Sequence, residues 1–189
     1  MTDPDLAEAT REGMRRAQAA GALVSFDLNL RPALWPRGVD PRPVAWQALE
    51  RAQLVKLSRE ELEWLAQDGS AEAVISRLFA NAARVVLVTD GAGPIRWWTR
   101  TRQGEAPTFR VDVVDTTAAG DAFVAGLLHR IVQLGLDADG VAGAFDDDPH
   151  RGDLLRHAAA CGALAATRYG AFAAMPTRAD ISALLAEAA

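Results

Sequence analysis

The stretch VVDTTAAGDAFVAGLL, residues 113–128, decides which fold and which chemistry to expect of this chain. Asp115 and Asp121 enclose threonines and small residues, and an apolar pattern with helical spacing follows at once. A helix that begins near Ala119 would leave its first backbone N–H groups without intrahelical partners, at the positive end of the helix dipole. Such a terminus binds anions, most often phosphate. Asp121 in the first turn could then accept a proton from a hydroxyl brought to the same anion.

The same residues also fit an ordinary helix cap. Asp115, Thr116 or Thr117 could cap the helix, and Asp121 could simply offset the dipole. The residues alone leave both interpretations open.

Composition narrows the class of protein. The chain has 189 residues, half of them hydrophobic and a quarter charged, which favours one soluble globular domain. The net charge of −5 without a basic stripe argues against a nucleic-acid partner. The single cysteine, Cys161, cannot form an internal disulfide and is expected in the core. No apolar run reaches the roughly 18 residues of a membrane span and no signal sequence opens the chain, so we expect a cytoplasmic protein without a membrane partner.

Strand-like runs alternate with helical patterns, which predicts an α/β fold with a mostly parallel sheet. The extended segments are predicted at 22–28, 53–58, 84–91, 95–100 and 108–114. The helices are predicted at 5–20, 44–52, 59–67, 71–82, 119–135, 154–168 and 177–188, with an acidic loop at 136–153.

Four polar clusters come directly after predicted strands. They are FDLNLR (26–31), KLSREE (56–61), VTDGAG (88–93) and VVDTTAAGD (113–121). Ligands of parallel sheets bind at the carboxyl ends of the strands, so the clusters are expected to converge on one edge. The alternative is that polar residues follow strands in any α/β protein.

The segment DTTAAGDAFVAGL (115–127) resembles the C-terminal signature of the PfkB, ribokinase-like, family of sugar kinases. This resemblance implies that Asp121 is the catalytic base and that the N–H groups of Ala118, Ala119 and Gly120 hold the transferring phosphoryl group. Many relatives have glycine where Ala118 stands. Alanine supplies the same N–H but restricts the backbone more.

The segment SFDLNLRPALW (25–35) resembles the Asp-x-Asn-x-Arg strand end of fructokinase-like members. It implies that Asp27, Asn29 and Arg31 contact the substrate or its phosphate. In an extended segment these alternating residues point to one side. The alternative is a turn, since Asn and Asp before proline are common in loops.

Two further strand ends resemble the family's nucleotide side. Ser58 and Glu61 form a capping box, and the resemblance adds a Mg²⁺-linked role for Glu61 and a nucleotide contact for Lys56. In VVLVTDGAGP (85–94), the family's nucleotide turn is matched by Thr89, Gly91 and Gly93. A dinucleotide motif and a P-loop are excluded because the third glycine and the Gly-Lys-Ser/Thr sequence are missing.

The segment CGALAATRYGAFAAMPTRADI (161–181) resembles the family's adenine-pocket wall, which also helps to bind a monovalent cation. The implied cation positions are Asp115, Thr117 and Gly170, with K⁺ as the ion. Ordinary core packing is the alternative for most of its alanines. The acidic loop lacks EF-hand spacing, and the histidines lack metal-ligand spacing.

The resemblance covers residues 5–187 but matches the C-terminal portion of the family's usual length, without its Gly-Gly segment and β lid. Residues 1–189 are therefore expected to be the C-terminal part of an ATP-dependent, Mg²⁺-using sugar kinase, with fructose as the favoured sugar. The alternatives are a 2-keto-3-deoxygluconate kinase, a ribokinase-like enzyme or a non-catalytic nucleotide-binding remnant. The expected partners are the sugar, ATP and, in the full-length form, a second copy. We expect no sugar phosphorylation by this chain alone.

Overall fold

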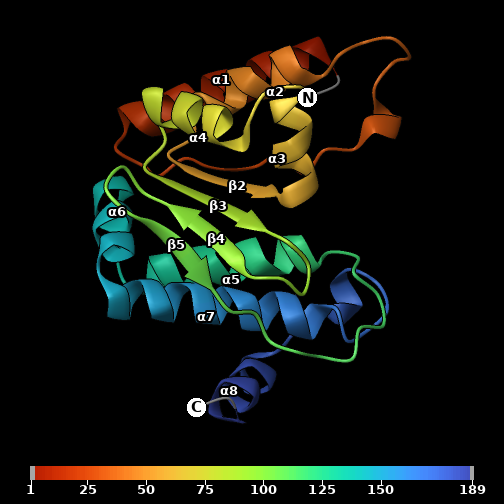
Figure 1. The fold of residues 1–189 in the computed structure, drawn as a ribbon, viewed down its shortest axis with the longest axis vertical. Coiled ribbons are helices and arrows are strands. Elements are labelled where there is room, and N and C mark those ends of the chain that lie inside the picture. The colour runs from red at the N-terminus through yellow and green to blue at the C-terminus, as the bar shows by residue number, and fades with distance from the viewer. Residues whose placement is uncertain (1–2, 188–189) are drawn as a thin grey trace. The chain divides into compact units, whose positions relative to one another are not determined.

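The computed structural model describes residues 3–187 and has an α/β architecture (Figure 1). Its sheet has five strands in the order β1-β2-β3-β4-β5. Neighbours β1, β2 and β3 run parallel, whereas β3 and β4 run antiparallel. The strands are β1 (Ser25–Asp27), β2 (Leu54–Ser58), β3 (Val85–Thr89), β4 (Ile95–Trp98) and β5 (Gln103–Ala106). The predicted fold class is confirmed.

Helices follow the strands, as the periodicity predicts. The α-helices are α1 (Pro4–Ala19), α2 (Arg42–Leu49), α3 (Arg59–Ala66), α4 (Ala71–Ala80), α5 (Ala119–Gln133), α6 (Ala138–Asp146), α7 (Asp148–Ala165) and α8 (Arg178–Glu187). Two short 3-10 helices are η1 (Pro32–Leu34) and η2 (Phe172–Ala174).

The chain divides into two compact units, and each is described by itself. The first unit contains the described part of Met1–Thr89, with Arg96–Gln103 and Asp137–Ala142. The second contains Asp90–Ile95, Gly104–Leu136 and the described part of Gly143–Ala189.

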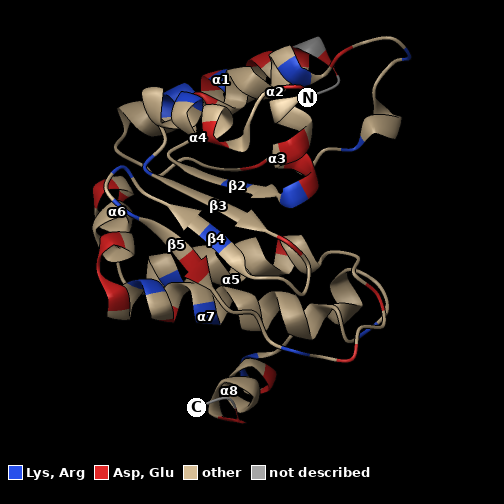
Figure 2. Ribbon diagram, viewed as in Figure 1, with Lys and Arg blue, Asp and Glu red and all other residues tan. Residues whose placement is uncertain are grey.

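The core of the first unit lies between α1 to α4 and one face of the parallel strands. Val55 and Leu57 of β2 and Val86 and Val88 of β3 alternate along their strands, so their side chains share this face. Against them pack buried residues of the helices, including Met14, Trp46, Leu49, Leu62 and Leu78. The outer surface of α1 carries interleaved acidic and basic residues (Figure 2). An amphipathic pattern of this kind is what a helix covering a sheet requires.

In the second unit, α5 and α7 pack closely side by side. A Cβ added at Gly126 of α5 would lie 2.5 Å from Cys161 Sγ on α7, so glycine permits this approach. A Cβ added at Gly162 of α7 would lie 3.1 Å from Ala119 O and 3.3 Å from Phe123 Cβ of α5. Cys161 is buried, which agrees with the core role predicted for it.

Two local predictions are wrong, and one strand is not predicted. The acidic stretch 136–153 is not a loop, because it contains α6 and the first turns of α7. Val141 and Phe145 are buried one helical turn apart, and Asp147 caps α7. The segment 108–114 forms no strand. Instead β5, largely exposed and without β-branched residues, occupies the edge of the sheet.

Candidate active site

The start of α5 is not capped by a described side chain. Its N-cap residue is Ala118, in a left-handed conformation with φ 60° and ψ 8°. The capping alternative for Asp115, Thr116 or Thr117 is therefore wrong for this helix. An uncapped helix start retains the capacity to bind an anion.

The amides at this helix start are not equivalent. Ala119 N donates to Thr116 O at 3.1 Å, so the tight turn before α5 already engages this N–H. Ala122 N reaches back to Ala118 O at 2.8 Å, as in a regular first turn. The predicted anion contacts of Ala118 and Gly120 are therefore easier to form than that of Ala119.

Asp121 lies in the first turn of α5, and this residue is exposed. This position is the positive end of the helix dipole. The position allows Asp121 to meet a hydroxyl that approaches an anion at the helix start.

Asp115, Thr117 and Gly170, the residues implied for a monovalent cation, are brought together. The Asp115 carboxylate accepts from Thr117 N at 2.9 Å through Oδ1 and from Gly170 N at 3.0 Å through Oδ2. These contacts, that with Gly170 first, lower the pKa of Asp115 below its ordinary value. Gly170 has φ 89°, a conformation that favours glycine.

In the first unit, Asp27 and Lys56 form an ion pair between neighbouring parallel strands. They are paired in the β1–β2 register, with 3.3 Å between Lys56 Nζ and Asp27 Oδ1. Lys56 is only 7% exposed. The nucleotide contact of Lys56 stays a prediction, and its ammonium is engaged by Asp27 in the structure.

The segment after Asp27 does not alternate as predicted. β1 ends at Asp27, and Asn29 has a left-handed backbone with φ 43°. Arg31 then precedes the 3-10 helix η1. A positive φ breaks the two-residue period of a strand, so the predicted alternation of Asp27, Asn29 and Arg31 is wrong. The left-handed backbone of Asn29 is that of a loop residue.

Glu61 connects two of the predicted clusters. Its Oε2 accepts from Ser58 N at 2.8 Å and completes the predicted capping box, while Ser58 Oγ accepts from Glu61 N. Its Oε1 accepts from Leu30 N at 2.7 Å and so holds the loop after β1. Sequence reasoning missed this second contact, because nothing local to either residue indicates it.

Thr89 ends β3 opposite Ser58 in the parallel register, so the first three strand ends meet at one edge as predicted. The turn that follows needs its glycines. Gly91 has φ 51°, and Gly93 N donates to Asp90 O at 2.7 Å. A Cβ on Gly93 would lie 3.0 Å from that same oxygen. The fourth cluster follows an irregular segment rather than a strand.

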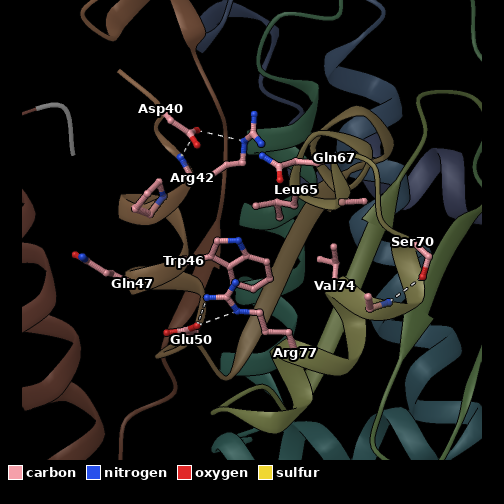
Figure 3. A pocket seen from close by; sticks show the side chains of 13 residues that line it. Asp40, Arg42, Trp46, Gln47, Glu50, Leu65, Gln67, Ser70, Val74 and Arg77 are labelled. Atoms are coloured by element: carbon pink, nitrogen blue, oxygen red, sulfur yellow. Dashed lines mark hydrogen bonds and ion pairs between the residues drawn. The ribbon is translucent and has the colours of Figure 1, made fainter. Parts of the chain in front are cut away.

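A cavity of about 600 Å³ in the first unit is lined by none of these residues (Figure 3). Its arginines already have acidic partners. Arg42 Nε lies 3.2 Å from Asp40 Oδ1, and Arg77 Nη2 lies 2.6 Å from Glu50 Oε1. Arg77 also stacks on Trp46, with 3.8 Å from its guanidinium carbon to the ring centroid. Both arginines are therefore engaged by neighbouring side chains.

The donor set limits how a metal could be held. No group of three or more His, Cys, Asp or Glu within the described residues could hold an ion. Both oxygens of Glu61 accept backbone hydrogen bonds, which leaves remaining lone pairs suited to a metal-bound water. That arrangement fits Mg²⁺, which keeps several waters and binds largely through substrate phosphates.

No helix within residues 3–187 is both long and apolar enough to cross a membrane.

Comparison with known proteins shows the family of the chain. A family model described as pfkB family carbohydrate kinase matches residues 1–178. Fructokinase-1 of Oryza sativa subsp. japonica is 38% identical over 93% of this chain, which spans about half (52%) of that relative's length. A fructokinase from Xylella fastidiosa, solved with bound ATP, superposes with a TM-score of 0.96 at 53% identity. The match covers all of this chain and 59% of the Xylella fastidiosa chain. A fructokinase from Vibrio cholerae O395, solved with fructose, ADP and calcium, superposes with a TM-score of 0.80 at 33% identity. The match covers 94% of this chain and 55% of the Vibrio cholerae chain.

Proposed function

Because the chain belongs to the pfkB family of carbohydrate kinases, we propose that it carries the phosphoryl-transfer groups of a sugar kinase that uses ATP, with fructose as the favoured acceptor. The observation that carries the proposal is the uncapped start of α5 with Asp121 in its first turn. The ATP bound to one relative and the fructose and ADP bound to another support the same substrates here.

In the proposed reaction, the amides of Ala118 and Gly120 stabilise charge on the γ-phosphoryl group, and Asp121 accepts the proton of the sugar hydroxyl. The transferred group passes to the hydroxyl oxygen, and ADP leaves. Asp115 has a positioning role, since its bonds to Thr117 and Gly170 fix the turn before α5.

Bound Mg²⁺ would neutralise charge on the phosphates, and Glu61 would orient one of its waters. The proposed contacts to the sugar or its phosphate are Asp27, Asn29 and Arg31. The proposed contacts to the nucleotide are Lys56, Thr89, Gly91 and Gly93. A monovalent cation, K⁺, is proposed beside Asp115, Thr117 and Gly170.

The test measures fructose-dependent ADP release by this chain and by a chimera that joins the N-terminal part of the Xylella fastidiosa fructokinase to it. We expect turnover by the chimera and none by the chain alone. In the chimera, Asp121→Asn should lower kcat by about 10²–10⁴-fold, the usual contribution of a general base, with little change in the KM for ATP.

Asp112→Asn is the matched control, because Asp112 is an exposed aspartate outside the proposed site and the charge change is the same. It should leave kcat unchanged. Near-normal turnover by the Asp121→Asn chimera would refute the role of Asp121 as base. ATP binding without any turnover by the unsubstituted chimera would favour a non-catalytic nucleotide-binding remnant.

A further inference from the structure

The second unit contains a pocket of about 380 Å³ whose lining comes from α5, α7 and α8. The lining residues are His129, Arg130, Gln133, His157, Arg178, Ile181, Ser182 and Leu185. None of them belongs to the proposed kinase site, and no aspartate or glutamate is part of this described lining.

The two arginines that line this pocket differ in their partners. Arg130 is neutralised by Asp153 of α7, with 2.7 Å between Nε and Oδ2 and a second bond of 3.2 Å. Arg178 lies at the exposed first turn of α8 and contributes its charge to the pocket. Asp180 in the same turn lies 3.4 Å from Arg168, and no carboxylate is part of the described lining. Arg178 therefore makes the pocket favour an anion as its ligand.

Two imidazoles complete the polar wall. The rings of His129 and His157 stack with their centroids 6.0 Å apart and an interplanar angle of 29°. Burial lowers the pKa of His157, and Arg130 and His129 lower it further, against the opposing effect of Asp153. Arg178 of α8 lines the same pocket, and Arg156 of α7, next to His157 in the chain, donates to Leu185 O of α8 at 2.7 Å. A bound anion would reverse the balance and favour the imidazolium.

We propose that this pocket binds small phosphate-bearing anions, with Arg178, His129 and His157 as the groups that hold the phosphate. A phosphate carries about 1.5–2 negative charges at pH 7 and three acceptor oxygens, enough to engage the guanidinium and both imidazoles together. Ile181 and Leu185 provide an apolar wall for the carbon body of a phosphate ester, and Ser182 adds a hydroxyl.

A divalent metal is the competing ligand for a pair of histidines. The described residues provide no third His, Cys, Asp or Glu for such an ion, and the positive charge of Arg178 lines the same pocket. Like charge near a cation raises the free energy of binding, so the anion is favoured over the metal.

The experiment follows the imidazole proton resonances of the three histidines of this chain by NMR at fixed ionic strength. The probes are inorganic phosphate and phenyl phosphate, with chloride as the salt control. We expect saturable shifts of His129 and His157 and a rise in the pKa of His157. His150, an exposed residue beside Asp147, is the internal reference and should not respond. Tighter binding of phenyl phosphate would assign the pocket to esters, and equal binding would assign it to phosphate itself.

Arg178→Gln should weaken phosphate binding about tenfold or more, the loss expected for one charge-assisted contact. Arg178→Lys should retain much of the affinity, and Arg110→Gln, an equal charge change at another exposed residue, should leave it unchanged. The absence of saturable shifts, equal effects of chloride and phosphate, or a response to Zn²⁺ alone would overturn the proposal. Urea unfolding of each variant verifies that the fold is intact.

Discussion

Asp115 accepts a hydrogen bond from the backbone N–H of Gly170, 55 positions further along the chain, with 3.0 Å between Oδ2 and N. Next to this contact, Val114 N and Asp115 N both donate to Ala166 O, at 2.8 and 3.2 Å. The segment before α5 is therefore held by three bonds against the end of α7 and the residues that follow it. This arrangement positions the turn at Ala118 from which the proposed anion site is built.

The first prediction concerns Asp115→Asn. The carboxylate has a folded-state pKa below its ordinary 3.8, so its contribution to stability is complete above that value and is lost as the pH falls through the lowered pKa. Asp115→Asn should reduce the urea midpoint at pH 7, and the difference from the unsubstituted chain should shrink below pH 3.8. Asp112→Asn should not reduce the midpoint at pH 7. A difference that is independent of pH would contradict the assignment to the carboxylate charge.

The second prediction concerns Ala118→Gly. Ala118 has φ 60°, a left-handed conformation that costs a residue with a Cβ about 1–2 kcal/mol of free energy and that glycine adopts without this cost. After the entropy cost of glycine, the substitution should stabilise the chain by about 0.5–1 kcal/mol in urea unfolding.

Ala119→Gly is the matched control for this position, because Ala119 is the first helical residue of α5. It should destabilise the chain by up to about 1 kcal/mol. If both glycine variants were destabilised equally, the left-handed strain at Ala118 would be refuted.

Local chemistry explains which parts of the fold the sequence predicts well. The capping box of Ser58 and Glu61 and the start of α5 depend on residues within one helical turn, and both are found as predicted. The left-handed Asn29 and the contact between Glu61 and Leu30 depend on residues brought together by folding. Strand β5 is another such case, because pairing at the sheet edge decides it and its own residues do not.

The site residues follow the same division. The pairing of Asp27 with Lys56 could be found once β1 and β2 are known to be parallel, since the register places them opposite each other. The motif at 115–121 predicts an anion site, yet it does not reveal that the Ala119 amide is engaged by Thr116 O. Hydrogen bonds within a turn depend on backbone angles that a pattern of residue types leaves open.

The third prediction concerns the ion pair of Asp27 and Lys56. Lys56→Met should destabilise the chain by about 3–5 kcal/mol, because it breaks the ion pair of the Asp27 carboxylate, whose side chain is 16% exposed. The double variant Asp27→Leu/Lys56→Met should recover much of this loss, since both charges are then removed. Urea unfolding of both single variants and the double variant gives the coupling free energy. Additive effects would contradict the pairing.

The last prediction concerns the contact of α5 with α7. A Cβ at Gly126 would lie 2.5 Å from Cys161 Sγ and 2.9 Å from Cys161 Cβ, so Gly126→Ala should destabilise the chain by about 1–3 kcal/mol through overpacking. Gly152→Ala, on α7 with nothing within 4 Å of the added Cβ, should instead stabilise it by up to about 1 kcal/mol. In Gly126→Ala/Cys161→Ala the sulfur is gone while the Cβ contact remains, so part of the loss should return. If Gly126→Ala were as favourable as Gly152→Ala in urea unfolding, α5 and α7 could not approach as closely as the structure shows.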